Sequence, residues 1–290
     1  MDFDLDLGLG LDALALTAIV AFDLDDTLAP SKSPLDVEMA VRLAELLERT
    51  NVAVISGGQF GQFRSQLISP LEQLGAGRLD RLHVMPACGT QYYRWEGSDR
   101  STLGQDDSGW VRRYVETLDH SEKARAFAAI ESSARVLGYW PEDPWGEALE
   151  DRESQVTFSA LGQEAPIEAK SIWDPTGAKM RRLQAAVAPL LPDLEVRVGG
   201  STSIDVTRRG RDKSFAIAKL LESTGYSLDD VLYFGDQLRE GGNNHPVAAM
   251  GVRCIEVDGW RDTLAALDVV LARAKRNRAS ADGAVGDPGR

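Results

Sequence analysis

The stretch "AIVAFDLDDTLAP", residues 18–30, decides the fold. The apolar and β-branched run "TAIVAF" at 17–22 is typical of a buried parallel strand, and it ends abruptly in Asp23, Asp25 and Asp26. Three carboxylates this close together repel one another and are costly to remove from water. Solvent, a metal ion or a catalytic role must therefore compensate them.

A parallel sheet follows from the segments after this strand. "LDVEMAVRLAELLERT" (35–50) predicts a helix that buries Val37, Ala40, Val41, Ala44 and Leu47, and "NVAVIS" (51–56) predicts a second buried strand. A strand, a helix and a strand in succession imply parallel strands with a right-handed crossover. Further buried strands are expected within 82–89, 230–236 and 251–257, and a helix within 212–224.

The middle of the chain has a different character. "SQVTFSALG" (154–162) and "LEVRVGGSTSIDVT" (194–207) alternate apolar and polar residues, as strands of an antiparallel sheet with one covered face do. The fold class is therefore α/β, a Rossmann-like core with a parallel sheet, interrupted by an inserted α+β cap domain. We expect the core at 14–90 and 210–275, the cap at 91–209, and a disordered tail at 276–290.

Charge and composition exclude several classes of function. A formal net charge of -13 over 290 residues repels nucleic acid and anionic membranes, so neither is expected as a partner. The first 16 residues carry four Asp and no Lys or Arg, which does not fit a secretory signal, and no apolar run is long enough to span a bilayer. The two cysteines have no metal-binding spacing. We expect a cytoplasmic protein whose partner is a small molecule.

Polar residues follow three of the expected parallel strands. Asp23 and Asp25 end the first, Ser56 and Gly57 follow the second, and Asp236 follows a later one. Ligands in open parallel sheets bind outside the carboxyl ends of the strands, so these residues are expected to share one site. Lys213, at the start of a predicted helix, adds positive charge to the N-terminal helix potential.

This combination of residue types suits phosphoryl transfer. An aspartate accepts the phosphoryl group as an aspartyl phosphate, and a carboxyl group two residues on protonates the leaving oxygen and later activates water. Mg²⁺ suits such a site because it prefers oxygen ligands and relieves the repulsion between the acids and the phosphate. A serine, glycine N–H groups and a lysine would hold the phosphoryl oxygens and offset their charge.

In their order along the chain, "FDLDDTL", "VISGG", "DK" and "FGDQLREGGNN" resemble the four motifs of the haloacid dehalogenase (HAD) superfamily. The long insert between the second and third motifs resembles the type IIB branch, whose α/β cap lies there. "EDRESQVTFSALGQ" and "GGSTSIDV" further resemble the eukaryotic-type phosphomannomutases and their bacterial phosphatase-like relatives. The resemblance covers nearly the whole chain.

The resemblance implies a role for each matching residue. Asp23 is the nucleophile and Asp25 the acid/base. The remaining roles are metal binding by Asp23, the Asp25 carbonyl, Asp236 and Asn243; phosphate binding by Ser56, Gly57 and Lys213; and substrate contact from the cap by Arg152, Ser203 and Asp205. The implied cofactor is Mg²⁺ and the implied substrate a small phosphorylated metabolite. A homodimer formed through the cap is one arrangement that the resemblance allows.

Two departures from the motifs bear on the activity. Asn244 stands where the family usually has Asp, and Gln163 stands where the phosphomannomutases have Arg. A mutase must bind a bisphosphorylated intermediate in two orientations, so a missing cap cation favours hydrolysis. We therefore expect a Mg²⁺-dependent phosphatase acting on a sugar phosphate, with a phosphomannomutase-like isomerase of hexose 1- and 6-phosphates as the alternative.

Simpler interpretations of the same residues stay open at this point. Acids after a strand also serve as turn or capping residues, which is the interpretation we favour for Asp26. Arg152, for which we favour substrate contact, also suits a surface ion pair with Glu150 or Glu153. A receiver-type signalling domain also carries an aspartate at a strand end, but it is far shorter and lacks the second carboxyl group. A catalytically inactive relative is disfavoured because Asp23 and Lys213 are intact.

Overall fold

The computed structural model describes residues 17–97, 109–199, 201–269 and 271–272. The chain divides into two compact units. The core unit comprises Met1–Tyr114 and Asp212–Arg290, and the cap unit is Val115–Arg211. Two distant segments of the sequence thus build one unit and the segment between them builds the other, as expected for an insertion.

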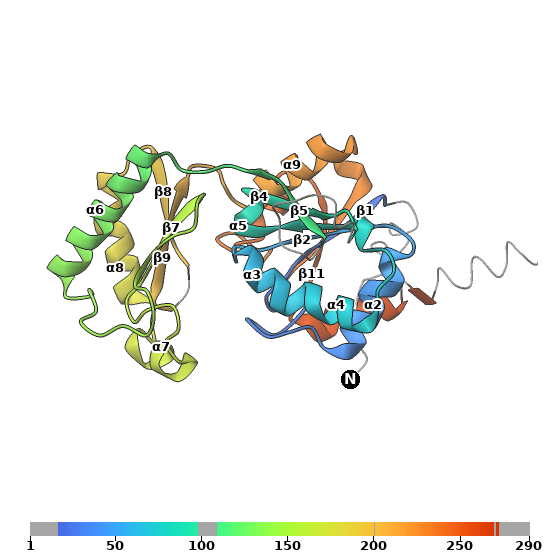
Figure 1. The fold of residues 1–290 in the computed structure, drawn as a ribbon, viewed down its shortest axis with the longest axis horizontal. Helices are drawn as coiled ribbons and strands as arrows, with labels where there is room; N and C mark the ends of the chain where they lie inside the picture. Colours follow the sequence, from blue (N-terminus) through green and yellow to red (C-terminus); the bar gives the residue numbers. More distant parts are fainter. Residues whose placement is uncertain (1–16, 98–108, 200, 270, 273–290) are drawn as a thin grey trace, which may run out of the picture. The chain divides into compact units, whose positions relative to one another are not determined.

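A seven-stranded sheet in the order β11-β10-β1-β2-β3-β4-β5 forms the centre of the core unit (Figure 1). The strands are β1 (Ile19–Asp23), β2 (Asn51–Ile55), β3 (Leu82–Met85), β4 (Gln91–Trp95), β5 (Trp110–Val115), β10 (Val231–Gly235) and β11 (Arg253–Glu256). The first five in the spatial order run parallel, and β4 is antiparallel to β3. The quoted stretch thus supplies β1, which lies inside the sheet between β10 and β2. The predicted α/β class with a mostly parallel core sheet is confirmed.

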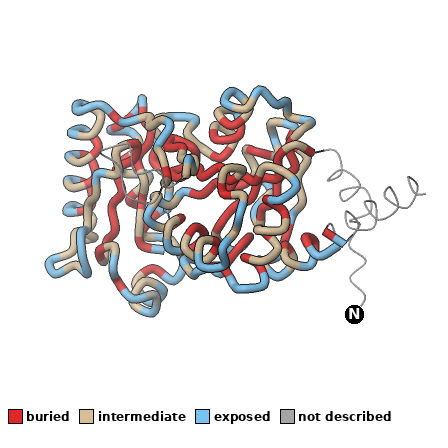
Figure 2. Tube along the Cα trace, turned by 45° about the vertical axis from the view of Figure 1, so that its right-hand side comes forward, coloured by how far each residue is buried: buried red, intermediate tan, exposed pale blue. Residues whose placement is uncertain are grey.

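Successive residues of β1 pack on opposite faces of this sheet. Val20 and Phe22 belong to the apolar cluster that holds α2 and α4, whereas Ile19 and Ala21 pack with α9. Both faces are thus covered, and the residues of β1 and β10 are all buried. Figure 2 shows the buried residues gathered in the interior of the trace. The helices of the core unit are α2 (Val37–Leu47), α3 (Phe60–Phe63), the π-helix η2 (Arg64–Ile68), α4 (Ser69–Leu74), η3 (Leu79–Arg81), α5 (Pro86–Gly89), α9 (Lys213–Thr224), η5 (Leu228–Asp230), α10 (His245–Ala249) and a helix over 260–269.

Helix α2 forms where expected, but the face that it buries only partly matches the predicted one, with Ala40 and Leu47 common to both. Its buried residues are Met39, Ala40, Leu43, Leu46 and Leu47. Val37, which was expected in the core, is 72% exposed. The stripe of large side chains at 39, 43, 46 and 47 buries more apolar surface than the predicted stripe, which contains two alanines and two valines, and this difference selects the face.

The cap unit contains a four-stranded antiparallel sheet in the order β6-β7-β9-β8. Its elements are α6 (His120–Leu137), β6 (Leu149–Asp151), β7 (Gln155–Ser159), α7 (Ile167–Trp173), α8 (Ala178–Val187), η4 (Ala188–Leu190), β8 (Leu194–Val198) and β9 (Ser203–Arg208). Val156, Phe158, Ile204 and Val206 pack on the apolar faces of α6 and α8. The alternate residues of β7 and β9 are polar, as predicted, but those of β7 are buried as well, so both faces of this strand are covered rather than one. The expected 194–207 segment folds as two paired strands.

The first boundary of the insert lies later than the expected residue 91. Strands β4 and β5 join the core sheet, where β4 pairs with β3 through His83–Arg94 and Val84–Tyr93. The cap therefore begins at Val115, and it ends at Arg211 rather than at 209. The expected tail at 276–290 and residues 14–16 of the expected core lie outside the described residues. In the described part of the chain, no helix has the length and apolar character needed to cross a membrane.

Candidate active site

Asp23 ends β1 and is buried, with 3% of its surface exposed. The backbone N–H of Leu24 donates to its Oδ1 at 2.7 Å. Its Oδ2 lies 2.5 Å from Nζ of Lys213, which is likewise 3% exposed. A buried carboxylate is tolerated only when it is paired and hydrogen-bonded, and Lys213 supplies the opposite charge. The negative charge of Asp23 is thus compensated by Lys213, which lies almost two hundred residues away in the sequence.

Lys213 is held at the first position of α9. The side chain of Asp212 caps this helix by accepting from the N–H groups of Ser214 (2.9 Å) and Phe215 (3.4 Å). A cation at a helix N-terminus is unfavourable with respect to the helix dipole. The ion pair with Asp23 offsets that cost, so the position of this lysine is explained by the site rather than by the helix.

Asn244 connects the charged residues of the site. It is fully buried. Its Oδ1 accepts from Nζ of Lys213 at 2.8 Å and from the hydroxyl of Tyr233 at 2.5 Å, and its Nδ2 donates to Asp23 Oδ2 at 3.0 Å and Asp236 Oδ1 at 2.9 Å. Because a lysine only donates, the amide oxygen must face Lys213 and the NH₂ group must face the two carboxylates.

The residue of this loop that reaches the acids is Asn244, not the expected Asn243. Asn243 is exposed, whereas Asn244 directly precedes α10 and lies inside. Two adjacent asparagines after two glycines give the sequence no means of choosing between them, because one residue of register decides which side chain points inward. The sequence also did not indicate Tyr233 as a site residue. It lies among apolar residues of β10, so the pattern predicts a core side chain and not a hydrogen-bond donor to Asn244.

Two groups around Asn244 have shifted titration. Burial, followed by the charge of Asp23, raises the pKa of Asp236 above its ordinary value. Burial, again followed by the charge of Asp23, raises the pKa of Tyr233 well above its ordinary value, so its hydroxyl stays protonated and donates to Asn244. The carboxylates at this end of the sheet repel one another, so additional positive charge would stabilise them.

Asp25 is held by donors from the following loop and helices. Its Oδ2 accepts from Gln62 Nε2 at 2.9 Å, and its Oδ1 accepts from the backbone N–H of Lys32 at 2.7 Å and from Gln66 Nε2 at 3.3 Å. Gln62 lies in α3 and Gln66 in the π-helix η2, a helix type that is frequent at functional sites. No sequence signal identified these two glutamines.

Asp26 serves as a turn residue, as we interpreted it. It has a positive φ of 58°, and its Oδ1 accepts from the N–H of Ser31 at 3.1 Å. Aspartate tolerates this left-handed conformation because its short side chain bonds to nearby backbone.

Ser56 lies at the end of β2 and is 3% exposed, and its Oγ accepts from the N–H of Gly58 at 3.2 Å. Gly57 has open space at its missing side chain apart from Cys88 Sγ at 3.9 Å. Helix α5 is hydrogen-bonded to this turn, because the N–H groups of Ala87 and Cys88 donate to the carbonyl oxygens of Gly58 and Ser56. Ala87 and Cys88 adopt left-handed φ values of 48° and 53°. Non-glycine residues in this region carry strain, and such strain is concentrated at functional sites.

The predicted cap residues lie on the polar side of the cap sheet. Asp205 Oδ1 accepts from Thr157 Oγ1 at 2.7 Å, and burial raises the pKa of Asp205. Ser203, at the start of β9, is partly exposed. They lie in the cap unit, whereas Asp23, Asp25, Ser56, Gly57, Lys213 and Asp236 lie in the core unit.

Arg152 forms an ion pair with Glu150, as in the simpler interpretation, but the pair is half-buried, with side chains that are 19% and 26% exposed. Its Nη2 lies 2.6 Å from Glu150 Oε2 and donates to Gln163 Oε1 at 3.0 Å. The guanidinium thus makes three hydrogen bonds within the cap unit, two to Glu150 and one to Gln163.

Comparison with known proteins agrees with this architecture. Residues 146–272 match the family model described as eukaryotic phosphomannomutase. A phosphomannomutase of Saccharomyces cerevisiae is 26% identical over 239 residues, covering 79% of this chain and 84% of that protein. One of Encephalitozoon cuniculi is 23% identical over 271 residues, covering 88% and 94%. The chain belongs to the HAD superfamily. Within it, the relationship is to the eukaryotic phosphomannomutase family with the type IIB cap.

Solved HAD structures and other enzymes share the fold at low sequence identity. A haloacid dehalogenase-like hydrolase from Bacteroides thetaiotaomicron aligns with a TM-score of 0.59 at 14% identity, covering 89% of this chain and 99% of that one. An IMP-nucleotidase from Plasmodium falciparum aligns with a TM-score of 0.63 at 14% identity, covering 92% and 73%. At this identity these structures bear on the fold alone.

Proposed function

We propose that this HAD enzyme transfers the phosphoryl group of a sugar phosphate through an aspartyl phosphate formed on Asp23. The observation that carries the proposal is the buried Asp23 at the carboxyl end of β1, with Lys213 Nζ 2.5 Å from its Oδ2. A carboxylate and an ammonium group held this way at a strand end serve the attack on a phosphate whose charge the lysine offsets.

Each step has a residue suited to it. A carboxylate oxygen of Asp23 attacks phosphorus, and the bond from phosphorus to the sugar oxygen breaks. Asp25 protonates that leaving oxygen and afterwards takes a proton from the hydroxyl group that attacks the aspartyl phosphate. Ser56, Gly57 and Lys213 bind the phosphoryl oxygens. The donors that fix Asp25, among them Gln62 at 2.9 Å, hold the acid/base in one orientation.

The donor set suits Mg²⁺. Asp23 and Asp236 both accept from the same amide group of Asn244, so their carboxylates face one small region. Among the described residues no group of three or more His, Cys, Asp or Glu forms a metal cluster, but Mg²⁺ commonly takes one or two carboxylates with water and phosphate oxygens. Asp23, Asp236 and the Asp25 carbonyl would hold the ion, which neutralises charge on the phosphoryl group when bound.

Asn244 lies beside the acids where Asn243 was expected as a metal ligand, but Asn244 does not itself serve as a ligand. Its oxygen already accepts from Lys213 and Tyr233, and its NH₂ group faces the acids. We assign it to positioning the two carboxylates.

The first candidate reaction is the isomerisation of hexose 1- and 6-phosphates. The relatives that align over most of the chain are named phosphomannomutases, and the matched family segment runs from the cap strands into the last core motif. In this reaction the aspartyl phosphate returns its phosphoryl group to the other hydroxyl of the sugar. The alternative of our sequence analysis is therefore favoured over hydrolysis by these relatives.

Hydrolysis is the second candidate, and one contact in the cap favours it. Arg152 is paired with Glu150, and its remaining contact goes to Gln163, where the phosphomannomutases carry a second arginine. A cap with fewer available cations binds the distal phosphate of a bisphosphate less tightly, so water competes better for the aspartyl phosphate.

The cytoplasmic location and a cap-mediated homodimer stay predictions.

A paired assay tests both candidates. Conversion of mannose 1-phosphate to mannose 6-phosphate with a hexose bisphosphate activator, and release of inorganic phosphate, are measured with and without Mg²⁺. Asp23→Asn is expected to abolish both activities, whereas Asp26→Asn, a matched change at the exposed turn residue, is expected to retain them. Full activity in Asp23→Asn would overturn the proposal.

A third variant distinguishes transfer of the phosphoryl group to sugar from its transfer to water. Gln163→Arg is expected to raise the ratio of isomerisation to phosphate release, because it restores a cap cation beside Arg152. An unchanged ratio would show that Gln163 does not decide between water and sugar.

A further inference from the structure

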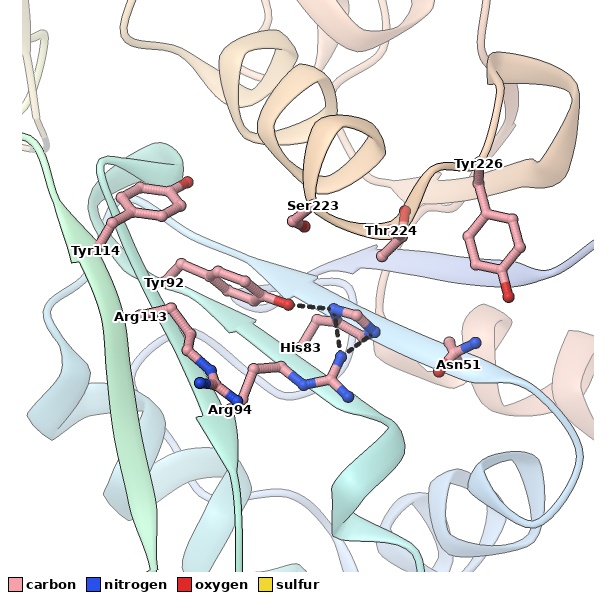
Figure 3. Close-up of a pocket in the computed structure, with 9 residues that line it drawn as sticks. All are labelled: Asn51, His83, Tyr92, Arg94, Arg113, Tyr114, Ser223, Thr224 and Tyr226. Carbon is pink, nitrogen blue, oxygen red and sulfur yellow. Dashed lines mark hydrogen bonds between the residues drawn. The ribbon is translucent and has the colours of Figure 1, made fainter.

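An open pocket of about 520 Å³ lies in the core unit (Figure 3). Its lining includes Asn51 at the start of β2 and Ser223 and Thr224 at the end of α9. Lys213 is the first residue of that same 12-residue helix, and a rise of about 1.5 Å per residue separates its ends by roughly 18 Å. The pocket and the candidate active site thus lie at opposite ends of α9.

The lining of this pocket is positively charged. It contains Arg94 and Arg113, which come from the neighbouring strands β4 and β5 (Figure 3), and among its described residues none is an aspartate or glutamate. The whole chain has a net charge of -13. The two arginines therefore give this pocket a positive charge that is opposite in sign to the charge of the protein as a whole. Such a local positive site is what a small anion needs in order to bind to an acidic protein.

The charge of Arg94 is not neutralised within the described part of the chain. Its Nη1 lies 2.7 Å from His83 Nδ1, its Nη2 donates to the backbone oxygen of Asp80, and none of the ion pairs between described residues includes it. Burial, and then the charge of Arg94, lowers the pKa of His83 to about 3, so the imidazole is neutral. A half-buried guanidinium is therefore fixed by neutral groups only.

Arg113 is paired, but weakly. It contacts Glu96, and the two side chains are 49% and 41% exposed. Ion pairs at such exposure contribute little to stability, so an anionic ligand can compete with Glu96 for this guanidinium.

We propose that this pocket is a second binding site, which takes a small phosphorylated metabolite whose phosphate is bound by Arg94 and Arg113. Phosphate monoesters carry a charge of about -1.5 to -2 at neutral pH, which matches two guanidinium groups, and arginine binds phosphate oxygens in bidentate geometry. The volume falls in the range of small-molecule sites, and Tyr92, Tyr114 and Tyr226 offer ring surface to the organic part.

Titration calorimetry of the full chain with AMP, in buffer containing EDTA, tests the proposal. Removal of divalent metal leaves the carboxylates of the candidate active site to repel phosphate, whereas the arginine pocket needs no metal. Saturable binding is expected, with affinity at least about tenfold lower in Arg94→Gln and in Arg113→Gln, because each loses charge-assisted hydrogen bonds. Arg239→Gln, which removes the same charge from an 87% exposed side chain of the core unit, is the matched control and is expected to bind as wild type.

The outcomes against the proposal are distinct. Binding that is lost in Lys213→Gln but kept in Arg113→Gln would assign AMP to the candidate active site, and equal weakening by Arg239→Gln would reduce the effect to net charge. Absence of saturation at millimolar AMP, or tighter binding of citrate than of AMP, would overturn the phosphate assignment. Arg94 also bonds to the backbone at Asp80, so thermal unfolding of each variant is recorded, and the half-exposed Arg113 keeps the test valid if Arg94→Gln unfolds.

Discussion

The amide nitrogen of Asn244 lies 3.0 Å from Asp23 Oδ2, at a position where the resembling motif carries a carboxylate. Replacement of a carboxylate by an amide at this point turns a repulsion into a hydrogen bond. The same NH₂ group donates to Asp236, so one neutral residue holds two acids together while Lys213 provides the only positive charge among the side chains that Asn244 contacts in the described part of the chain.

Asn244→Asp is therefore expected to lower stability in the absence of Mg²⁺. The new carboxylate would face Asp23 and Asp236 in a buried site and would lose two hydrogen bonds, at a cost of about 2–4 kcal/mol. Urea unfolding with EDTA measures the loss, and added Mg²⁺ is expected to raise Tm more than it does in wild type. Asn243→Asp, next in sequence but exposed, is the control and should behave as wild type. Equal stability of the two variants in EDTA would contradict this account.

Tyr233→Phe is expected to disturb the orientation of Asn244 without creating a charge. Oδ1 of Asn244 keeps the hydrogen bond from Lys213, so the free energy of unfolding should fall by only about 1 kcal/mol. Turnover should fall while KM changes little, because the reacting carboxylate is less firmly placed. Tyr92→Phe loses a similarly buried hydroxyl that contacts His83 instead, and it should lose stability alone. A Tyr233→Phe enzyme with wild-type turnover would restrict this tyrosine to a structural role.

Gln62→Leu is expected to slow the steps in which Asp25 moves a proton. The variant removes the 2.9 Å donor to Oδ2 and leaves the contacts from Lys32 and Gln66. Because positioned acid/base catalysis contributes about 10²–10⁴-fold, partial loss of positioning should lower kcat about tenfold. Rapid-quench measurement of the aspartyl phosphate would show whether its breakdown has slowed. Gln59→Leu, at an exposed residue whose side chain makes no capping bond, is the control, and an equal loss there would count against a role for Gln62.

The fold and the charged residues of the site were predictable from the sequence because they depend on local patterns. β1 and β10 are short apolar runs that end in acids, and the ends of parallel strands meet at one edge whatever the loops do. The seven-stranded sheet was only partly predictable. β4 and β5 carry aromatic and charged residues suited to either unit, and only the pairing of β4 with β3 assigns them to the core.

Other features depend on a single residue of register or on a contact distant in sequence. The choice between Asn243 and Asn244 is set by where α10 begins, and the choice of the buried face of α2 by how Met39 and Leu43 pack on the sheet. The support of Asp25 by Gln62 follows from close packing at Gly58, where a Cβ atom would lie 2.0 Å from Gln62 Oε1. Periodicity cannot reveal contacts of this kind, since neither partner belongs to a repeated pattern.

His83 should make the stability of the core unit depend on pH. Its pKa of about 3 lies below the ordinary value of 6.5, chiefly because of burial and then because of Arg94. The unfolded chain therefore takes up a proton as the pH falls below 6.5 while the folded chain does not until about pH 3, so stability is lost as the pH falls through that window. Between pH 7.5 and 5.5 this one group should lower the free energy of unfolding by about 1.4 kcal/mol.

Urea unfolding of wild type and His83→Gln at both pH values isolates this contribution. The variant lacks the imidazole, and the contributions of all other titrating groups cancel when the two proteins are compared. His120→Gln, at an exposed histidine that begins α6, should keep the wild-type dependence, and a His83→Gln protein that kept it too would show that His83 is protonated in the fold.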